Sequence, residues 1–148
     1  SGEKVMELKT KYHGVLNYEK KDVITFKKGI PGFDNLKKFI LVPAEENSIF
    51  GILQSIEDTD IGIVVASPFN VYKNYEFDID DDKMSELNIK DNKDVLVLNT
   101  VTLNSKLENI TINLKAPIVI NTNYKIGEQL ILDNVDYPIK YPLLKGEV

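Results

Sequence analysis

The chain of 148 residues contains no cysteine, which excludes disulfide bonds, thiolate metal sites and a cysteine nucleophile. Its formal net charge is -5, and all 18 of its basic residues are lysine, so the bidentate contacts that arginine makes with phosphate or guanine are absent and nucleic-acid binding is disfavoured. No apolar run approaches the roughly 18 residues of a membrane span.

The length fits one domain, which we expect to span residues 6–148. Residues 1–5 are expected to lie outside it, as an expression remnant or a flexible N-terminal extension, because Met6 resembles a native start. The lack of cysteine, together with the lack of a visible signal peptide, favours a cytoplasmic protein.

Short apolar segments between turn residues predict a series of strands. The segment 23–26 is expected to direct Ile24 and Phe26 inward. Residues 95–103 form the longest strand candidate and are apolar on both faces, which predicts a central position. Further strands are predicted over residues 8–12, 39–42, 49–54 and 61–66.

Turns and two short helices are predicted between these strands. Gly-Ile-Pro-Gly-Phe at residues 29–33 is typical of a type II turn, because proline presets one backbone angle and glycine accepts a positive φ. A helical turn is predicted over residues 34–39. A second helix is expected to begin at the aspartates of residues 80–82 and to end at Asn88.

Residues 110–132 are the expected centre of the fold. From residue 110 to residue 115, apolar side chains alternate with polar ones, which indicates a half-buried strand. Pro117 lacks the N–H group that a sheet ladder needs, so the chain is expected to bulge, to lie at a sheet edge or to change sheet before residues 118–120 resume a strand. Residues 129–132 are expected to return as the next antiparallel strand.

Residues 134–140 are predicted to form a last edge strand together with Tyr141. Many short strands with frequent turn signals, and only two small helices, indicate an all-β, mainly antiparallel fold. We therefore expect a small β-barrel-like or sandwich domain with one or two short helices.

The sequence contains little that supports catalysis or metal binding. Its one histidine, His13, has no Gly-x-Ser-x-Gly motif beside it. Residues 78–82 resemble the start of a calcium loop, but Lys83 stands where that loop needs glycine and Ile89 where it needs glutamate. We therefore predict no catalytic residue, no metal and no cofactor, and we favour a binding surface over an enzyme.

Charges are distributed unevenly along the chain. Lysines gather between residues 9 and 38, whereas acidic residues gather between residues 45 and 82. An acidic segment of this kind attracts a basic partner over a long range.

Five blocks of sequence stand out by their order and spacing. They are Gly-Ile-Pro-Gly-Phe at residues 29–33, Leu-Gln-Ser-Ile-Glu-Asp at 53–58, Pro68 followed by Tyr75, Thr-Ile-Asn-Leu-Lys-Ala-Pro-Ile-Val-Ile-Asn at 111–121 and Gly-Glu-Gln at 127–129. Taken together, they resemble the pattern of the bacterial flagellar assembly factor FliW family. The resemblance runs over nearly the whole chain.

The resemblance implies a small β-barrel-like protein without catalytic activity that acts in the cytoplasm by exchanging protein partners. Members of this family bind newly made flagellin, and they also bind CsrA, the RNA-binding dimer that represses flagellin translation. By this analogy, export of flagellin frees the protein to take CsrA off the flagellin message. The acidic segment fits that role, because it would attract a basic repressor and repel RNA phosphate. Direct nucleic-acid binding and membrane association are not expected.

Six residues in or near these blocks are predicted to contact a partner through exposed side chains. They are Phe33, Gln54, Ser55, Glu57, Asp58 and Tyr75. Flagellin termini are helical and bury apolar stripes, so the resemblance also implies an aromatic groove. Its expected lining is drawn from Phe33, Tyr72, Tyr75 and Phe77.

Two other classes of protein fit parts of the pattern. A carbohydrate- or peptide-binding β module would share the strands and the exposed aromatic residues, and small ligands would raise its thermal stability. An OB-like RNA binder would also be a β-barrel, but the negative net charge and the absence of arginine weigh against it.

Overall fold

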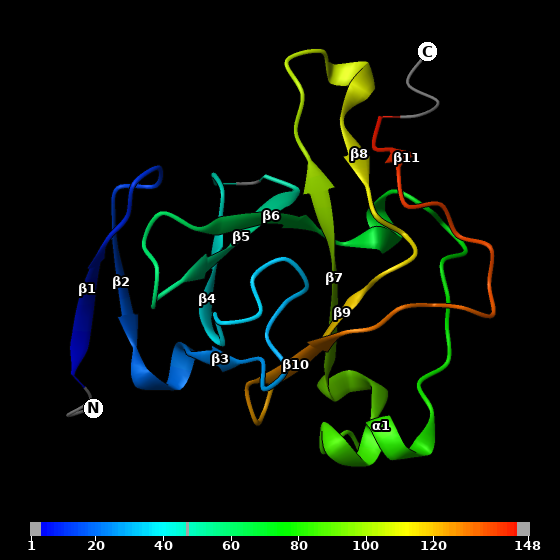
Figure 1. Ribbon diagram of the computed structural model, residues 1–148, viewed down its shortest axis with the longest axis horizontal. Coiled ribbons are helices and arrows are strands. Elements are labelled where there is room, and N and C mark those ends of the chain that lie inside the picture. The colour runs from blue at the N-terminus through cyan, green and yellow to red at the C-terminus, as the bar shows by residue number, and fades with distance from the viewer. Residues whose placement is uncertain (1–3, 47, 145–148) are drawn as a thin grey trace.

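The computed structural model describes residues 4–46 and 48–144 and is mainly β (Figure 1). The strands are β1 (Val5–Lys9), β2 (Val15–Glu19), β3 (Ile24–Thr25), β4 (Lys38–Pro43), β5 (Phe50–Ser55), β6 (Gly62–Ala66), β7 (Val95–Thr102), β8 (Thr111–Ile112), β9 (Ile118–Asn121), β10 (Ile126–Gln129) and β11 (Tyr141–Pro142). The α-helix is α1 (Asp81–Glu86), and the short 3-10 helices are η1 (Lys20–Asp22), η2 (Pro68–Asn70), η3 (Asn92–Asp94) and η4 (Leu107–Asn109).

Seven strands close into a barrel. Their order is β7-β6-β5-β4-β3-β10-β9, and β9 pairs with β7 to complete the ring. Only the short β3–β10 pairing, between Thr25 and Ile126, is parallel among the strands that the structure describes. The prediction of a mainly antiparallel β fold is therefore confirmed, and the architecture is a mixed barrel rather than a sandwich.

The barrel interior is filled by apolar side chains from β3, β4, β5, β6, β7 and β9 and from the turn after β3. Phe26 and Phe39 meet edge to face at its centre, with ring centroids 5.6 Å apart, and neither ring is exposed. The other buried members are Ile24, Ile30, Leu53, Val65, Leu98, Ile118 and Ile120. Ile24 and Phe26 point inward as predicted.

Two connecting segments cover the outside of the barrel. One is the strap, residues 67–79, which runs from β6 towards α1, and the other joins β10 to β11 (Figure 1). Aromatic rings join the two segments, since the Tyr137 ring lies 4.8 Å from that of Tyr75 and 5.6 Å from that of Tyr72. They cover a second apolar cluster that includes Ile112 and Leu114.

Residues 111–121 of the predicted central stretch run beside β7 as one interrupted strand. The antiparallel return strand is β10, which begins at Ile126 and ends at Gln129 rather than spanning residues 129–132. Ile112 in β8 pairs with Val101, and Ile118 in β9 pairs with Leu98, so six residues on one side span three on the other. The intervening segment bulges, and its Pro117 sits where a ladder donor is not required. The expected bulge before residue 118 is thus confirmed.

The N-terminal part of the fold differs from the prediction. Strand β1 begins at Val5 and ends at Lys9, rather than spanning residues 8–12, and it forms a separate hairpin with β2, which was not predicted. The hairpin stands beside the barrel (Figure 1). Residues 1–3 of the expected N-terminal extension, and residues 145–148 of the predicted domain, lie outside the described residues.

Two other expectations differ from the structure. Residues 34 and 35 form a turn and residues 36 and 37 are irregular, so the predicted helix is absent. The N–H groups of Lys37 and Lys38 bond to the side chain of Glu57 instead, and β4 already begins at Lys38. The predicted last edge strand is present only at its end: among the described residues it is β11, which begins at the predicted Tyr141, while residues 134–140 form no strand. The helix at the aspartates is confirmed as α1, with Asp80 accepting the N–H of Lys83 at 2.8 Å.

Candidate functional site

Four of the six predicted contact residues lie at the end of β5 and in the loop that follows it. Gln54 and Ser55 are only 1% and 0% exposed. The Gln54 amide donates to the carbonyl oxygens of Ser55 and Ile61, each at 3.0 Å, and the Ser55 hydroxyl oxygen accepts the N–H of Asp58 at 2.9 Å. These two side chains fix the shape of the loop from within.

Glu57 joins this loop to the neighbouring turn. The backbone N–H groups of Lys37 and Lys38 donate to its Oε1 atom at 2.6 and 2.8 Å. These two bonds hold the pKa of the Glu57 carboxyl below its ordinary value, because they stabilise the charged form. The carboxylate is exposed, as is that of Asp58, which accepts the N–H of Asp60 at 3.0 Å.

Phe33 lies on the turn that leads to Lys37. The turn is closed by a bond from the Phe33 N–H to the carbonyl of Ile30 at 2.7 Å, and Gly32 has the positive φ of +92° that a type II turn needs. The Phe33 ring is 36% exposed and lines a hollow of about 340 Å³ beside Ile63 and Ile131. The bonds from Lys37 and Lys38 join the loop that carries Glu57 and Asp58 to the chain segment that follows Phe33. We call the three exposed residues Phe33, Glu57 and Asp58 the turn-loop surface.

Tyr75 lies elsewhere, beneath the strap. Its hydroxyl donates to the carbonyl of Leu114 at 2.7 Å and accepts the amide N–H of Asn99 at 3.2 Å. Burial raises the pKa of Tyr75 to about 12, although the bond from Asn99 acts in the opposite direction. The side chain is 4% exposed, so its position is that of an internal clamp between the strap and the bulge before β9.

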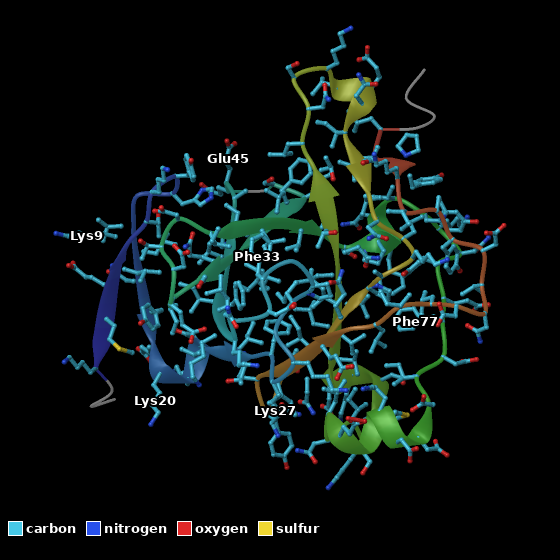
Figure 2. The ribbon with its side chains drawn as sticks, in the orientation of Figure 1. Lys9, Lys20, Lys27, Phe33, Glu45 and Phe77 are labelled. Carbon is cyan, nitrogen blue, oxygen red and sulfur yellow. The ribbon has the colours of Figure 1, made fainter. Side chains whose placement is uncertain are left out.

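The expectation of exposed side chains is therefore wrong for Gln54, Ser55 and Tyr75. We expected these polar side chains to contact a partner at the surface. They can be buried because backbone groups of the surrounding segments supply their hydrogen-bond partners. The predicted aromatic groove is formed only in part, because Tyr75 and Phe77 line one groove whereas Phe33 lines a different hollow. Phe33 lies over the barrel, whereas Phe77 lies to its right in the view, on the strap (Figure 2).

The groove that Tyr75 and Phe77 line lies between the strap, α1 and β7, whose part in it was not predicted. Its volume is about 680 Å³. Its apolar walls and floor are formed by Phe69, Phe77, Ile79, Met84, Val95 and Val97. Glu76 and Asp78 also line it, and both are exposed. We call this feature the strap groove. The sequence signal that could have located it is Pro68, which stops β6 and sends the chain into the strap.

The described residues offer no constellation for metal chemistry. Within residues 4–46 and 48–144, no group of three or more His, Asp or Glu side chains is arranged to hold a metal ion. His13 lies in the turn between β1 and β2, where its backbone N–H donates to the Thr10 hydroxyl at 2.9 Å. Among the described residues, no helix has the length and apolar character needed to cross a membrane.

Comparison with known proteins places these features in context. A family model described as FliW protein matches residues 7–143 of the chain. The flagellar assembly factor FliW of Clostridium kluyveri, strain ATCC 8527, is 67% identical over 143 residues, which cover 97% of this chain and 99% of that protein. The flagellar assembly factor FliW of Clostridium novyi, strain NT, is 59% identical over 140 residues, covering 95% and 98%.

The fold has a counterpart among solved structures. A crystal structure of the flagellar assembly factor FliW superposes with a TM-score of 0.86 at 38% sequence identity. The match covers 97% of this chain and 100% of the other. The barrel, the strap and the loops described above thus belong to a shared architecture.

Proposed function

Because the chain belongs to the FliW family of flagellar assembly factors, we propose that it binds newly made flagellin and antagonises the translational repressor CsrA by exchanging one protein partner for the other. The family is one of assembly factors rather than enzymes. In this scheme flagellin occupies the protein until export removes it, and the freed protein then binds CsrA and relieves repression of flagellin synthesis. Both steps take place in the cytoplasm.

The observation that carries this proposal is the 67% identity to a flagellar assembly factor over nearly the full chain. Similarity of that extent includes the loops and surface residues as well as the barrel core, and partners are recognised through such surfaces. The negative net charge and the acidic strap and α1 support binding of a basic RNA-binding repressor, since opposite charges speed encounter.

The turn-loop surface is the part of the predicted site that we retain for partner contact. It exposes the apolar side chain of Phe33 and the carboxylates of Glu57 and Asp58. Gln54 and Ser55 support this surface by holding the loop, and Tyr75 holds the strap. A partner would therefore touch the first three residues and depend only indirectly on the others.

Isothermal titration calorimetry with purified flagellin and purified CsrA tests the proposal. We expect binding to each partner, and we expect Phe33→Ala to weaken at least one of the two interactions about tenfold, because a partly exposed aromatic ring is a common binding anchor. Ile139→Ala, which shortens an exposed apolar side chain outside the turn-loop surface, is the matched control. Absence of heat with both folded partners would contradict the function, and unchanged affinities in Phe33→Ala would contradict only the assigned surface.

A further inference from the structure

Strand β7 has different neighbours along its two edges. On one edge, residues 95–98 pair with residues 118–121 of β9. On the opposite edge, β6 pairs only with Asn99 and Thr100, because Pro68 ends that strand and the chain turns into η2. Within the part of the chain that the structure describes, no strand pairs with residues 95–98 on this second edge.

The strap groove follows this unpaired edge. Val95, Leu96 and Val97 all line it, although successive side chains of a strand point to opposite faces. A groove that reaches three consecutive residues must therefore run along the backbone rather than over one face. Every second residue of an antiparallel strand directs its N–H and C=O groups to a given edge, so backbone groups of this segment face the groove. The N–H of Val95 is already bonded to the carbonyl of Asn92, so it is not one of the groups that the edge offers.

The chemistry of the groove selects among possible occupants. An unpaired strand edge is a template for another extended chain, which can bond to the N–H and C=O groups of that edge. A bound helix could not, because its own backbone groups already bond within the helix. The apolar side chains beside the edge, among them Phe77, Ile79 and Val97, favour apolar residues at alternate positions of that chain. Glu76 and Asp78 are the charged residues that line the groove among those described, so the complementary partner is basic.

We propose that the strap groove binds an extended segment of a protein partner by strand addition to residues 95–98 of β7, with apolar side chains at alternate positions and lysine or arginine beside Glu76 and Asp78. That this partner belongs to the flagellar system rests on the proposed function. The type of segment follows from the groove alone.

A synthetic peptide tests the groove directly. The probe is an acetylated decapeptide that alternates valine and threonine and carries two lysines at each end, titrated to millimolar concentration into the isotope-labelled full chain. We expect backbone amide shifts at residues 95–98 and weaker binding, by about tenfold, in the Glu76→Lys, Asp78→Lys double variant. A peptide with proline at its centre should lose binding, because proline cannot complete the ladder.

The matched control is the Glu108→Lys, Asp133→Lys double variant, which makes the same change in net charge at exposed positions outside the groove. It should bind the peptide within about twofold of the wild-type affinity, since distant exposed charges are screened by salt. Absence of shifts at residues 95–98, or equal weakening in both double variants, would overturn the inference.

Complexes with flagellin and with CsrA separate this inference from the proposed function. Slower amide exchange at residues 95–98 in either complex would support the inference and identify the partner that uses the groove. If both complexes form and neither slows exchange there, the inference is wrong and the proposed function stands. If the peptide binds at residues 95–98 but neither protein binds, the groove inference stands and the proposed function fails.

Discussion

Tyr75 belongs to one of the sequence blocks that point to the family, yet its side chain acts inside the protein. Tyr75→Phe should lower the free energy of unfolding by about 1–3 kcal/mol, because it leaves the Leu114 carbonyl and the Asn99 amide without the partner that they share. Urea unfolding followed by circular dichroism measures the change. Tyr124→Phe, at a ring that is 59% exposed, should be neutral within about 0.5 kcal/mol. Equal unfolding midpoints for the two variants would contradict the clamp.

This placement also determines how partner binding should be examined. A variant that truncates both Phe33 and Tyr75 to alanine would combine loss of the partner contact with loss of stability. The reason is that Tyr75 is a buried member of the second apolar cluster. The single substitution Phe33→Ala avoids this problem, because the ring is 36% exposed.

Glu57 should make the stability of the protein depend on pH. Its pKa in the folded protein is lower than the ordinary 4.5, so its contribution is present above about pH 4.5 and is lost as the pH falls through the lower, folded-state pKa. Glu57→Gln should therefore destabilise the protein at pH 7, by less than about 1 kcal/mol because the group is exposed, and should make less difference at pH 3.

Urea unfolding of wild type and Glu57→Gln at the two pH values measures this difference. Glu108→Gln removes one exposed negative charge away from the turn-loop surface and serves as the control. A Glu57→Gln effect that grows towards pH 3 would show that the two backbone bonds do not favour the ionised carboxylate.

At the level of elements, the contact between β10 and the barrel interior depends on a glycine. A Cβ atom at Gly127 would lie 2.6 Å from the Phe26 ring and 3.0 Å from the Val119 carbonyl oxygen. Gly127→Ala should therefore destabilise the protein by about 1–3 kcal/mol through overpacking. Gly51→Ala is the control, because its new methyl group would meet the mobile end of Leu41 at 3.3 Å. Similar unfolding free energies for both variants would contradict tight packing at β10.

Helix α1 is attached to β10 by an ion pair. The Lys83 ammonium donates to Glu128 at 2.7 Å, both side chains are 17% exposed, and this bond raises the pKa of Lys83. Lys83→Met should lower the free energy of unfolding by about 1 kcal/mol and speed amide exchange in α1. Among the described residues, the ion-pair partner that Glu128 then retains is the more exposed Lys28, at 3.6 Å. Hydrogen-exchange mass spectrometry measures this. Lys90→Met, at an exposed position, should leave exchange in α1 unchanged; a similar effect in both variants would contradict the attachment.

At the scale of the whole molecule, patterns within one segment were enough to predict β4 to β7, α1 and the bulge at Pro117. Each depends on local features: alternating polarity, a capping aspartate or a missing N–H donor. The β1–β2 hairpin was located poorly, because it stands outside the barrel and Leu8 is its only fully buried residue among those described. Apolar and polar residues therefore alternate only weakly along its two strands.

The site was harder to predict than the fold because it depends on contacts between distant segments. Glu57 bonds to backbone groups 19 and 20 residues away, within the segment where a helix was expected. Gln54 and Ser55 are polar in sequence, but the loop around them satisfies their hydrogen bonds and buries them. The strap groove exists because β6 pairs with only part of β7. How far two strands pair depends on both segments, so neither segment alone predicts the groove.

Exchange of partners is the central claim, and a competition experiment tests it most directly. A preformed complex of the protein with CsrA is titrated with flagellin, and the species are separated by gel filtration. The account predicts that flagellin releases free CsrA and takes its place in the complex. A stable complex of all three proteins, with CsrA retained at saturating flagellin, would contradict it.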